Sequence, residues 1–318
     1  LIYAHGQENI AVTGKGTLDG SASWENWWRM TRDEKNADSP ASKSGLLAHG
    51  ERGTPVEERI FGDGHLLRPA FIQPYSCRNI LIEGVTLTNA PMWVINPVLS
   101  SNITVSGVTV ASHGPNNDGC DPDSSRDVLI EGCLFDTGDD CIAVKSGKDA
   151  DGRRVNVPSE NIIIRNCVMK DGHGGVVLGS EISGGIRNVF AEDCTMSSPD
   201  LDRALRLKTN AGRGGSIENI FFRNVNVGRV AHSVMTIDLV YSDVKSGPFP
   251  PTVRNVEIGN VTSASSPRVL WVVGTDNSII ENVRVIDSVF KGVEGPDVLS
   301  RSGSIRLENV TVEPVNAP

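Results

Sequence analysis

The sequence has few aromatic residues and no long apolar run. Aromatic side chains make up 5% of the 318 residues. No segment approaches the roughly 18 consecutive apolar residues of a membrane-spanning helix, so we expect no membrane insertion. The net charge of −9 and the pI near 5.2 argue against nucleic acid as a partner, because a polyanion requires a basic surface. An acidic sugar polymer is compatible with this charge if the basic groups are gathered locally.

Convincing helical periodicity is also missing. Apolar residues alternate with a period of two, which predicts short strands. Phrases of this kind recur, as in RNILIEGVTL, SNITVSGVTV and ENIIIRNCVM. In each phrase the alternation follows a polar residue, here called the anchor, which is the Asn in the second position of these three. From the second anchor onward, consecutive anchors are 23 to 36 residues apart. The anchors are Asn9, Asn79, Asn102, Asp127, Asn161, Asn188, Asn219, Asn255 and Asn282.

Repeats of this length predict a solenoid, because one coil cannot bury its own inner face and must stack on its neighbours. We expect an all-β fold, namely a single-stranded right-handed parallel β-helix of about ten coils and roughly 50 Å, at about 4.8 Å per coil. Residues 1–318 would form one catalytic domain with a non-repeat insertion at about residues 21–68. No amphipathic cap precedes Leu1, so we expect an N-terminal cap region to be lacking from this chain.

Six cysteines suggest disulfides, but the repeat gives three of them another role. The positions six residues after the anchors form a column in which cysteine alternates with valine: Val85, Val108, Cys133, Cys167, Cys194, Val225, Val261, Ser288 and Val310. The cysteines of this column are predicted to be small core residues with free, stacked thiols. No C-x-x-C metal motif is present, and the state of Cys77, Cys120 and Cys141 stays open.

Three aspartates and a histidine occupy related places on successive coils. Asp139 and His173 both lie twelve residues after their anchors, so we expect them to be neighbours. Asp140 follows directly, and Gly138 would allow a turn or bulge that brings both carboxylates to one surface. Asp118 lies sixteen residues after its anchor and can join them only if the preceding loop bulges outward.

A pair of basic residues follows one coil later. Arg206 and Lys208 are two residues apart, so their side chains point the same way on a strand. Glycoside hydrolysis requires one protonated carboxyl and one ionised carboxylate, and close carboxylates push their pKa values apart. The basic pair would bind the carboxylate of an acidic sugar. Each motif alone also fits a turn or a solvated strand face, but their order on consecutive coils favours a site.

These motifs resemble those of the polygalacturonases, glycoside hydrolase family 28. The signatures of that family are N-T-D, G-D-D, G-H-G and R-I-K. They correspond here to residues 116–118, 138–140, 172–174 and 206–208, with Asn117 in place of Thr and Leu207 in place of Ile. The resemblance extends over nearly the whole chain. It implies an inverting hydrolase of α-1,4-linked galacturonic acid in pectin, without cofactor or metal.

The resemblance also implies a role for each motif residue. Asp139 would be the general acid, Asp118 and Asp140 would activate water, and His173 would support the acid. Inversion would place the acid and the base roughly 6.5–9.5 Å apart. The substrate-binding residues would be Arg206, Lys208, Tyr241 and Asn116.

Two departures from the repeat bear on the shape of the cleft. The charged loop at residues 148–158 would narrow one end, which slightly favours exo-action over endo-action. Trp24, Trp27 and Trp28 lie in the insertion, where they would either stack on sugar rings or pack the insertion onto the β-helix.

Three other functions remain open at this point. They are hydrolysis of another pectic backbone such as rhamnogalacturonan, a calcium-dependent pectate lyase-like reaction, and non-catalytic binding of the tail-spike kind. The G-H-G and R-x-K motifs argue against the lyase. We expect a monomer with a pectic polysaccharide as its partner, and the substrate suggests a secreted or periplasmic location.

Overall fold

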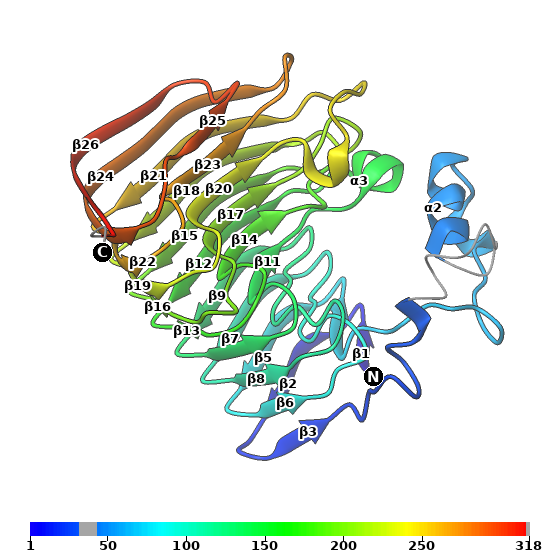
Figure 1. The fold of residues 1–318 in the computed structure, drawn as a ribbon. Coiled ribbons are helices and arrows are strands. Elements are labelled where there is room, and N and C mark those ends of the chain that lie inside the picture. The colour runs from blue at the N-terminus through cyan, green and yellow to red at the C-terminus, as the bar shows by residue number, and fades with distance from the viewer. Residues whose placement is uncertain (32–42, 316–318) are drawn as a thin grey trace.

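The computed structural model describes residues 1–31 and 43–315, which fold as a right-handed parallel β-helix (Figure 1). All paired strands run parallel, and the coils wind through three faces around a central apolar core. The predicted fold class is therefore confirmed. Within the described residues, no helix is long and apolar enough to cross a membrane.

The first face confirms the repeat count, because it carries ten strands, one for each recurring phrase. In spatial order they are β2 (Glu8–Thr13), β5 (Arg78–Glu83), β7 (Ser101–Ser106), β9 (Arg126–Glu131), β12 (Ser159–Arg165), β15 (Ile186–Glu192), β18 (Ser216–Arg223), β21 (Thr252–Gly259), β24 (Ile279–Val293) and β26 (Ile305–Pro314).

The second face is made of shorter strands that follow a turn in each coil. They are β3 (Thr17–Asp19), β6 (Thr86–Thr88), β8 (Thr109–Ser112), β10 (Leu134–Thr137), β13 (Val168–Met169), β16 (Thr195–Met196), β19 (Asn226–Arg229) and β22 (Thr262–Ser265).

The third face carries the residues of the cleft. Its strands are β1 (Ile2–His5), β4 (Ile72–Tyr75), β11 (Ile142–Val144), β14 (Val176–Gly179), β17 (Arg203–Lys208), β20 (Ser233–Asp238), β23 (Leu270–Val273) and β25 (Val298–Ser300). Isolated bridges through Ile95 and Cys120 link β4 to β11.

The anchors form a ladder of side-chain hydrogen bonds along the first face. Asn188 donates to Asn161 at 3.1 Å and accepts from Asn219 at 3.0 Å, and the same contact recurs along most of the rod. All nine anchors have φ between +53° and +59°, a left-handed conformation that Asn and Asp tolerate better than most residues. A side-chain amide both donates and accepts, so each Asn forms hydrogen bonds with the anchors on both sides of it.

The cysteines are buried and unpaired, as predicted for those of the column. All six, Cys77, Cys120, Cys133, Cys141, Cys167 and Cys194, are free thiols within the described residues. In the column itself, Ser288 replaces the thiol with a hydroxyl that donates to the Ile286 carbonyl at 2.8 Å. Small side chains suit this position because the coil turns there against its neighbours.

Two short helices interrupt the all-β fold within the described residues, although the sequence shows no convincing helical periodicity. The structure has α2 (Lys43–Glu51) and α3 (Asp149–Val155), together with the 3₁₀ turns η1 (Val56–Glu58) and η2 (Tyr241–Asp243). Such short helices carry little periodicity and are stabilised mainly by their surroundings. In α3, acidic residues in the first turn and basic residues in the last complement the helix dipole. Tertiary contacts complete it, since Arg153 lies 3.8 Å from the Phe249 ring centroid.

The described part of the insertion packs against the β-helix. The Trp28 indole donates to the Ala90 carbonyl at 3.0 Å and lies directly on Gly114, where a Cβ would approach the ring to 2.3 Å. Trp24 meets Trp28 edge to face. None of the three tryptophans of the insertion lines the cleft described below. Of the two predicted roles, Trp28 therefore packs the insertion onto the β-helix and does not stack on a sugar ring in the cleft.

Candidate active site

A cavity of about 510 Å³ lies over the third face, beside α2 and α3. Its lining includes Asp118, Asp139, Asp140 and Lys208, which come from the turns and strands of successive coils. Leu46 and Trp93 add apolar surface. The cavity therefore combines charged groups with a wall suited to a sugar ring, as ligand sites commonly do.

Asp139 and His173 are neighbours, as their equal offsets predicted. The His173 Nδ1 and Asp139 Oδ1 atoms are 2.8 Å apart. The backbone holds the aspartate in place, because its carbonyl accepts from the Thr137 hydroxyl at 2.9 Å and from the His173 amide at 3.0 Å. The imidazole is half exposed, whereas the carboxylate is mostly buried.

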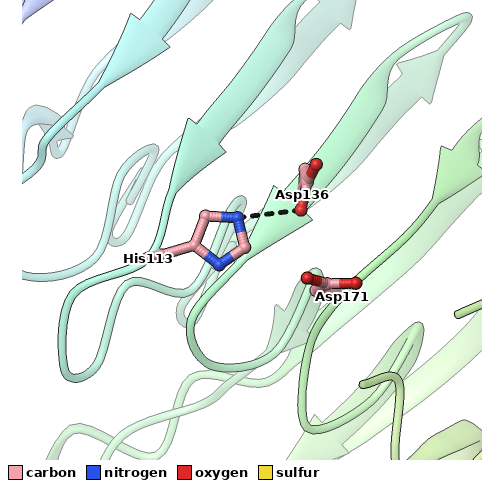
Figure 2. A group of neighbouring side chains, drawn as sticks. All are labelled: His113, Asp136 and Asp171. Carbon is pink, nitrogen blue, oxygen red and sulfur yellow. Dashed lines mark ion pairs between the residues drawn. The ribbon is translucent and has the colours of Figure 1, made fainter. Parts of the chain in front are cut away.

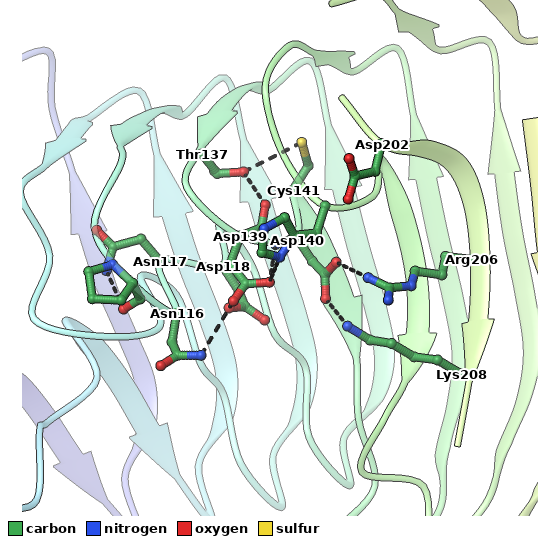
Figure 3. A network of polar contacts seen from close by, with 12 residues as sticks. Asn116, Asn117, Asp118, Thr137, Asp139, Asp140, Cys141, Asp202, Arg206 and Lys208 are labelled. Carbon is green, nitrogen blue, oxygen red and sulfur yellow. Dashed lines mark hydrogen bonds and ion pairs between the residues drawn. The ribbon is translucent and has the colours of Figure 1, made fainter. Parts of the chain in front are cut away.

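Asp118 reaches the same point through a tight turn. The Asn117 side chain accepts from the Ser112 hydroxyl at 2.6 Å and from the Gly114 amide at 2.9 Å, which folds the loop before Asp118. Asn116 adopts a left-handed φ of 57° in this turn. The bridges of Cys120 meanwhile keep the coil in register. Asp118 is thereby brought within reach of Asp139 and Asp140, as Figure 3 shows.

Asp140 is buried and held by the basic pair. Its two carboxylate oxygens face Lys208 Nζ at 2.6 Å and Arg206 at 3.7 Å (Figure 3). Both basic side chains thus point the same way from β17, as their spacing predicted. Gly138 allows the chain to pass close to the preceding loop, since a Cβ there would lie 2.6 Å from the Gly114 carbonyl oxygen.

The carboxyls of this site differ strongly in acidity. Burial, and then the charge of Asp139, raises the pKa of Asp118 to about 7, against the opposing charge of Lys145. Burial also acts on Asp139, but the hydrogen bond from His173 and the charge of Lys208 lower its pKa to about 2. The same hydrogen bond raises the pKa of His173. Both shifts favour an imidazolium beside a carboxylate in the His173–Asp139 pair.

The predicted distance between acid and base is wrong. Oxygens of Asp118, Asp139 and Asp140 all lie within 4.8 Å of one another, less than the 6.5–9.5 Å expected. Two of these residues are adjacent in the chain, and the parallel stacking of coils, about 4.8 Å apart, sets the distance to the third. The three carboxylates form one compact group.

The two remaining predicted residues also lie at this site. The Asn116 amide donates to Asp139 Oδ2 at 3.3 Å, and its own oxygen accepts from Arg68 at 2.7 Å. The Tyr241 ring lines the cavity, with Lys208 Nζ 5.4 Å and the Arg206 guanidinium 5.7 Å from its centroid. All eight predicted site residues are thus gathered in one region.

Sequence reasoning missed a second, deeper layer of charge. The buried Lys145 Nζ lies 3.2 Å from Asp118, 3.5 Å from Asp121 and 3.5 Å from Glu181. It also lies 4.7 Å from the centre of the Trp93 ring. The only signal in the sequence was a lone lysine directly after the apolar run CIAV, which nothing linked to the acids.

Among the residues that the structure describes, two groups of side chains have the spacing to hold a metal ion. The first is Asp118, Asp139 and Asp140, which already has Lys145 beside Asp118 and both Lys208 and Arg206 beside Asp140. The second is His113, Asp136 and Asp171, which come from three successive coils, with Asp136 in strand β10 (Figure 2). There, His113 Nε2 meets Asp136 at 2.8 Å. The Ser198 hydroxyl donates to Asp171 at 2.5 Å.

Comparison with known proteins gives a consistent result. The model of Glycosyl hydrolases family 28 matches residues 63–312. A probable polygalacturonase of Vitis vinifera is 33% identical over 231 residues, which are 71% of this chain and 40% of that protein. An exo-poly-α-D-galacturonosidase of Dickeya chrysanthemi is 28% identical over 96% of this chain and 53% of its own length. The chain thus spans about half the length of these curated relatives.

A solved structure is also similar over almost the whole chain. The hyperthermoactive exopolygalacturonase of Thermotoga maritima has 43% sequence identity and a TM-score of 0.92. The match covers 98% of this chain and 71% of that one.

Proposed function

Because the chain belongs to glycosyl hydrolase family 28, we propose that it hydrolyses the α-1,4 bonds between galacturonic acid residues in pectin. The observation that carries this proposal is the compact group of Asp118, Asp139 and Asp140 in a cleft lined by Lys208, with Arg206 3.7 Å from Asp140. Carboxyls of differing acidity supply acid and base, and the cations suit a uronate.

In the proposed mechanism, Asp139 donates a proton to the leaving oxygen. Its low pKa in the free protein depends on His173 and Lys208. A substrate carboxylate bound to Lys208 would offset that positive charge and exclude water, so the pKa of Asp139 would rise. The proton of the His173–Asp139 pair would then shift to the aspartate, which makes it a competent acid.

Asp118 and Asp140 hold the attacking water on the other side of the sugar. Asp140 is paired with Lys208 at 2.6 Å, and Lys145 lies 3.2 Å from Asp118. A water between these two carboxylates can give up its proton as it attacks the anomeric carbon. The family resemblance implies inversion, although the spacing of at most 4.8 Å is shorter than is typical of inverting enzymes.

Arg206, Lys208 and Tyr241 bind the substrate in this proposal. Arg206 has no short bond to Asp140, since the distance is 3.7 Å, so its donors are available to a uronate carboxylate. The Tyr241 ring lies beside both cations and offers a face to the sugar. Asn116 donates to Asp139 and steadies the acid.

We propose exo-action for this cleft. Helices α2 and α3 contact each other, and residues of both line the cavity beside the acids. Arg59 of the insertion donates hydrogen bonds of 2.5 and 3.1 Å to Asp151 of α3, so the two helices form a fixed wall of the cavity. A long polymer cannot pass through such a wall, whereas a chain end can enter. The names of the Dickeya and Thermotoga relatives agree with this proposal.

The enzyme would act as a secreted or periplasmic monomer.

The test is product analysis with polygalacturonic acid and the purified protein, with and without a calcium chelator. We expect saturated galacturonate from the start, unaffected by chelation, and NMR of the first product would report the inverted β-anomer. An unsaturated, chelator-sensitive product would indicate a lyase instead. A ladder of oligomers would contradict exo-action, and activity on rhamnogalacturonan alone would contradict the assigned backbone.

A further inference from the structure

The buried charges beneath the cleft do not balance if all of them are ionised. Lys145 faces the carboxylates of Asp118, Asp121 and Glu181 at 3.2 to 3.5 Å. Glu181 has a second cation, Arg213, at 3.6 Å. The ammonium group of Lys145 therefore has to serve two further buried carboxylates, Asp118 and Asp121, and the charge of Asp140 acts on both of them as well. Like charges held this closely in an apolar setting favour a proton on one of them.

Asp121 has the poorest surroundings for a negative charge. Its side chain is completely buried. Neither of its oxygens accepts a hydrogen bond from a donor group among the described residues, and its distance to Lys145 exceeds that of Asp118. Burial, and then the neighbouring Asp118, raises its pKa well above the usual range. Asp118 instead lines the cavity, where substrate and water have access.

We propose that Asp121 is a permanently protonated carboxylic acid, and that Asp121 and Lys145 together are positioning residues that keep Asp118 available as an ionised base. The neutral Asp121 donates its proton to Asp118 as a hydrogen bond, and Lys145 supplies the positive charge. Neither residue touches the substrate. Asp118 thereby gains a donor on its buried side, while its other face is free to hold water.

This arrangement separates the roles of the groups that face Asp118. Asp139 and Asp140 raise its pKa by repulsion, whereas Lys145 and Lys208 lower it. A protonated Asp121 contributes no charge. The acid limb of the pH profile of kcat/KM, which reports the ionisation of the free enzyme's base, should therefore depend on Lys145 and be insensitive to the charge of Asp121. This part of the inference rests on the proposed function.

The main experiment measures that pH profile for the Asp121→Asn and Lys145→Met variants. Asn copies a neutral carboxylic acid, so Asp121→Asn should retain activity within about threefold and leave the acid limb in place. Lys145→Met should move the acid limb upward by about 1–3 pH units, as loss of an adjacent cation does. Matched controls are Asp136→Asn and Lys170→Met at the His113 cluster. Both should leave the activity and the position of the acid limb unchanged.

Two results would overturn the proposal. A downward shift of the acid limb in Asp121→Asn would mean that an ionised Asp121 repels Asp118 in the parent. An unchanged limb in a folded Lys145→Met variant would mean that Lys145 is structural only. If Lys145→Met does not fold, the pH profile of Asp121→Asn still decides whether Asp121 is neutral in the parent.

Infrared spectroscopy gives a readout that needs no activity. At pH 8 the parent should show a carbonyl band of a buried neutral carboxylic acid, which Asp121→Asn abolishes and Asp136→Asn retains. Absence of this band in the parent would refute the inference even in an active enzyme. Its presence in a protein that fails to cleave polygalacturonic acid would uphold the protonated Asp121 while refuting the proposed function.

Discussion

The anchor ladder and the acid site are built by the same geometry with opposite chemistry. In both, residues at equivalent places on successive coils meet across the spacing of the stack. In the ladder the stacked groups are amides, and Asn188 both donates and accepts within 3.1 Å. In the cleft they are carboxylates, which repel each other and need Lys145, Lys208 and His173. The ladder therefore stabilises the rod, whereas the cleft holds groups of unusual acidity.

The most severe test of this difference is Asp139→Asn. The amide preserves the shape of the side chain but cannot donate an acidic proton, so turnover should fall by about 10²–10⁴-fold. The fold should persist, because the coil register does not depend on this group. Initial rates on polygalacturonic acid and a circular dichroism melt would check both parts. A variant as active as the parent would show that Asp139 is not the acid.

Arg206→Met should have the next largest effect. It removes a charge-assisted bond to the substrate carboxylate worth about 1.5–3 kcal/mol, which corresponds to a loss of about 10–100-fold in kcat/KM. Asp140 keeps Lys208 at 2.6 Å, so the site should remain assembled. The control is Arg187→Met, whose guanidinium pairs with Glu160 on the outer surface. An unchanged KM would argue against the carboxylate-binding role.

Asn188→Ala tests the ladder and should alter stability rather than activity. It removes two side-chain hydrogen bonds and places alanine at φ +57°, which costs about 1–2 kcal/mol for the backbone alone. The melting temperature should fall by about 2–4 °C for each kcal/mol lost. Asn188→Gly loses the same bonds without the backbone strain, so it should melt between Asn188→Ala and the parent. Equal melting of all three would show that the ladder is energetically neutral.

Asp118→Asn should change stability at only one end of the pH range. Burial raises the pKa of Asp118 from 3.8 to about 7, so the folded state binds its proton more tightly than the unfolded state. Stability from this group is present at low pH and is lost as pH rises from about 4 to 7. The variant should therefore melt clearly above the parent at pH 8 but not at pH 4. Thermal melts at both values test this, and a larger gain at pH 4 would contradict the sign.

Much of the site was predictable because the β-helix turns sequence offset into position. Asp139 and His173 share an offset of twelve residues and lie 2.8 Å apart. Arg206 and Lys208 share a strand face and both reach Asp140. The helices α2 and α3 were missed because their stability comes from contacts such as the one between Arg59 and Asp151, which join residues far apart in sequence.

The sequence by itself determined the solenoid, its ten coils, the free thiols of the cysteine column and the order of the charged motifs, because each follows from a local pattern repeated at a near-regular period. Only the tertiary structure decided the spacing of the three aspartates and the burial of Lys145 beneath them. Those depend on how a turn of irregular length folds over the next coil and on how much water is excluded there. Acidity at the site follows from that burial, which no local pattern encodes.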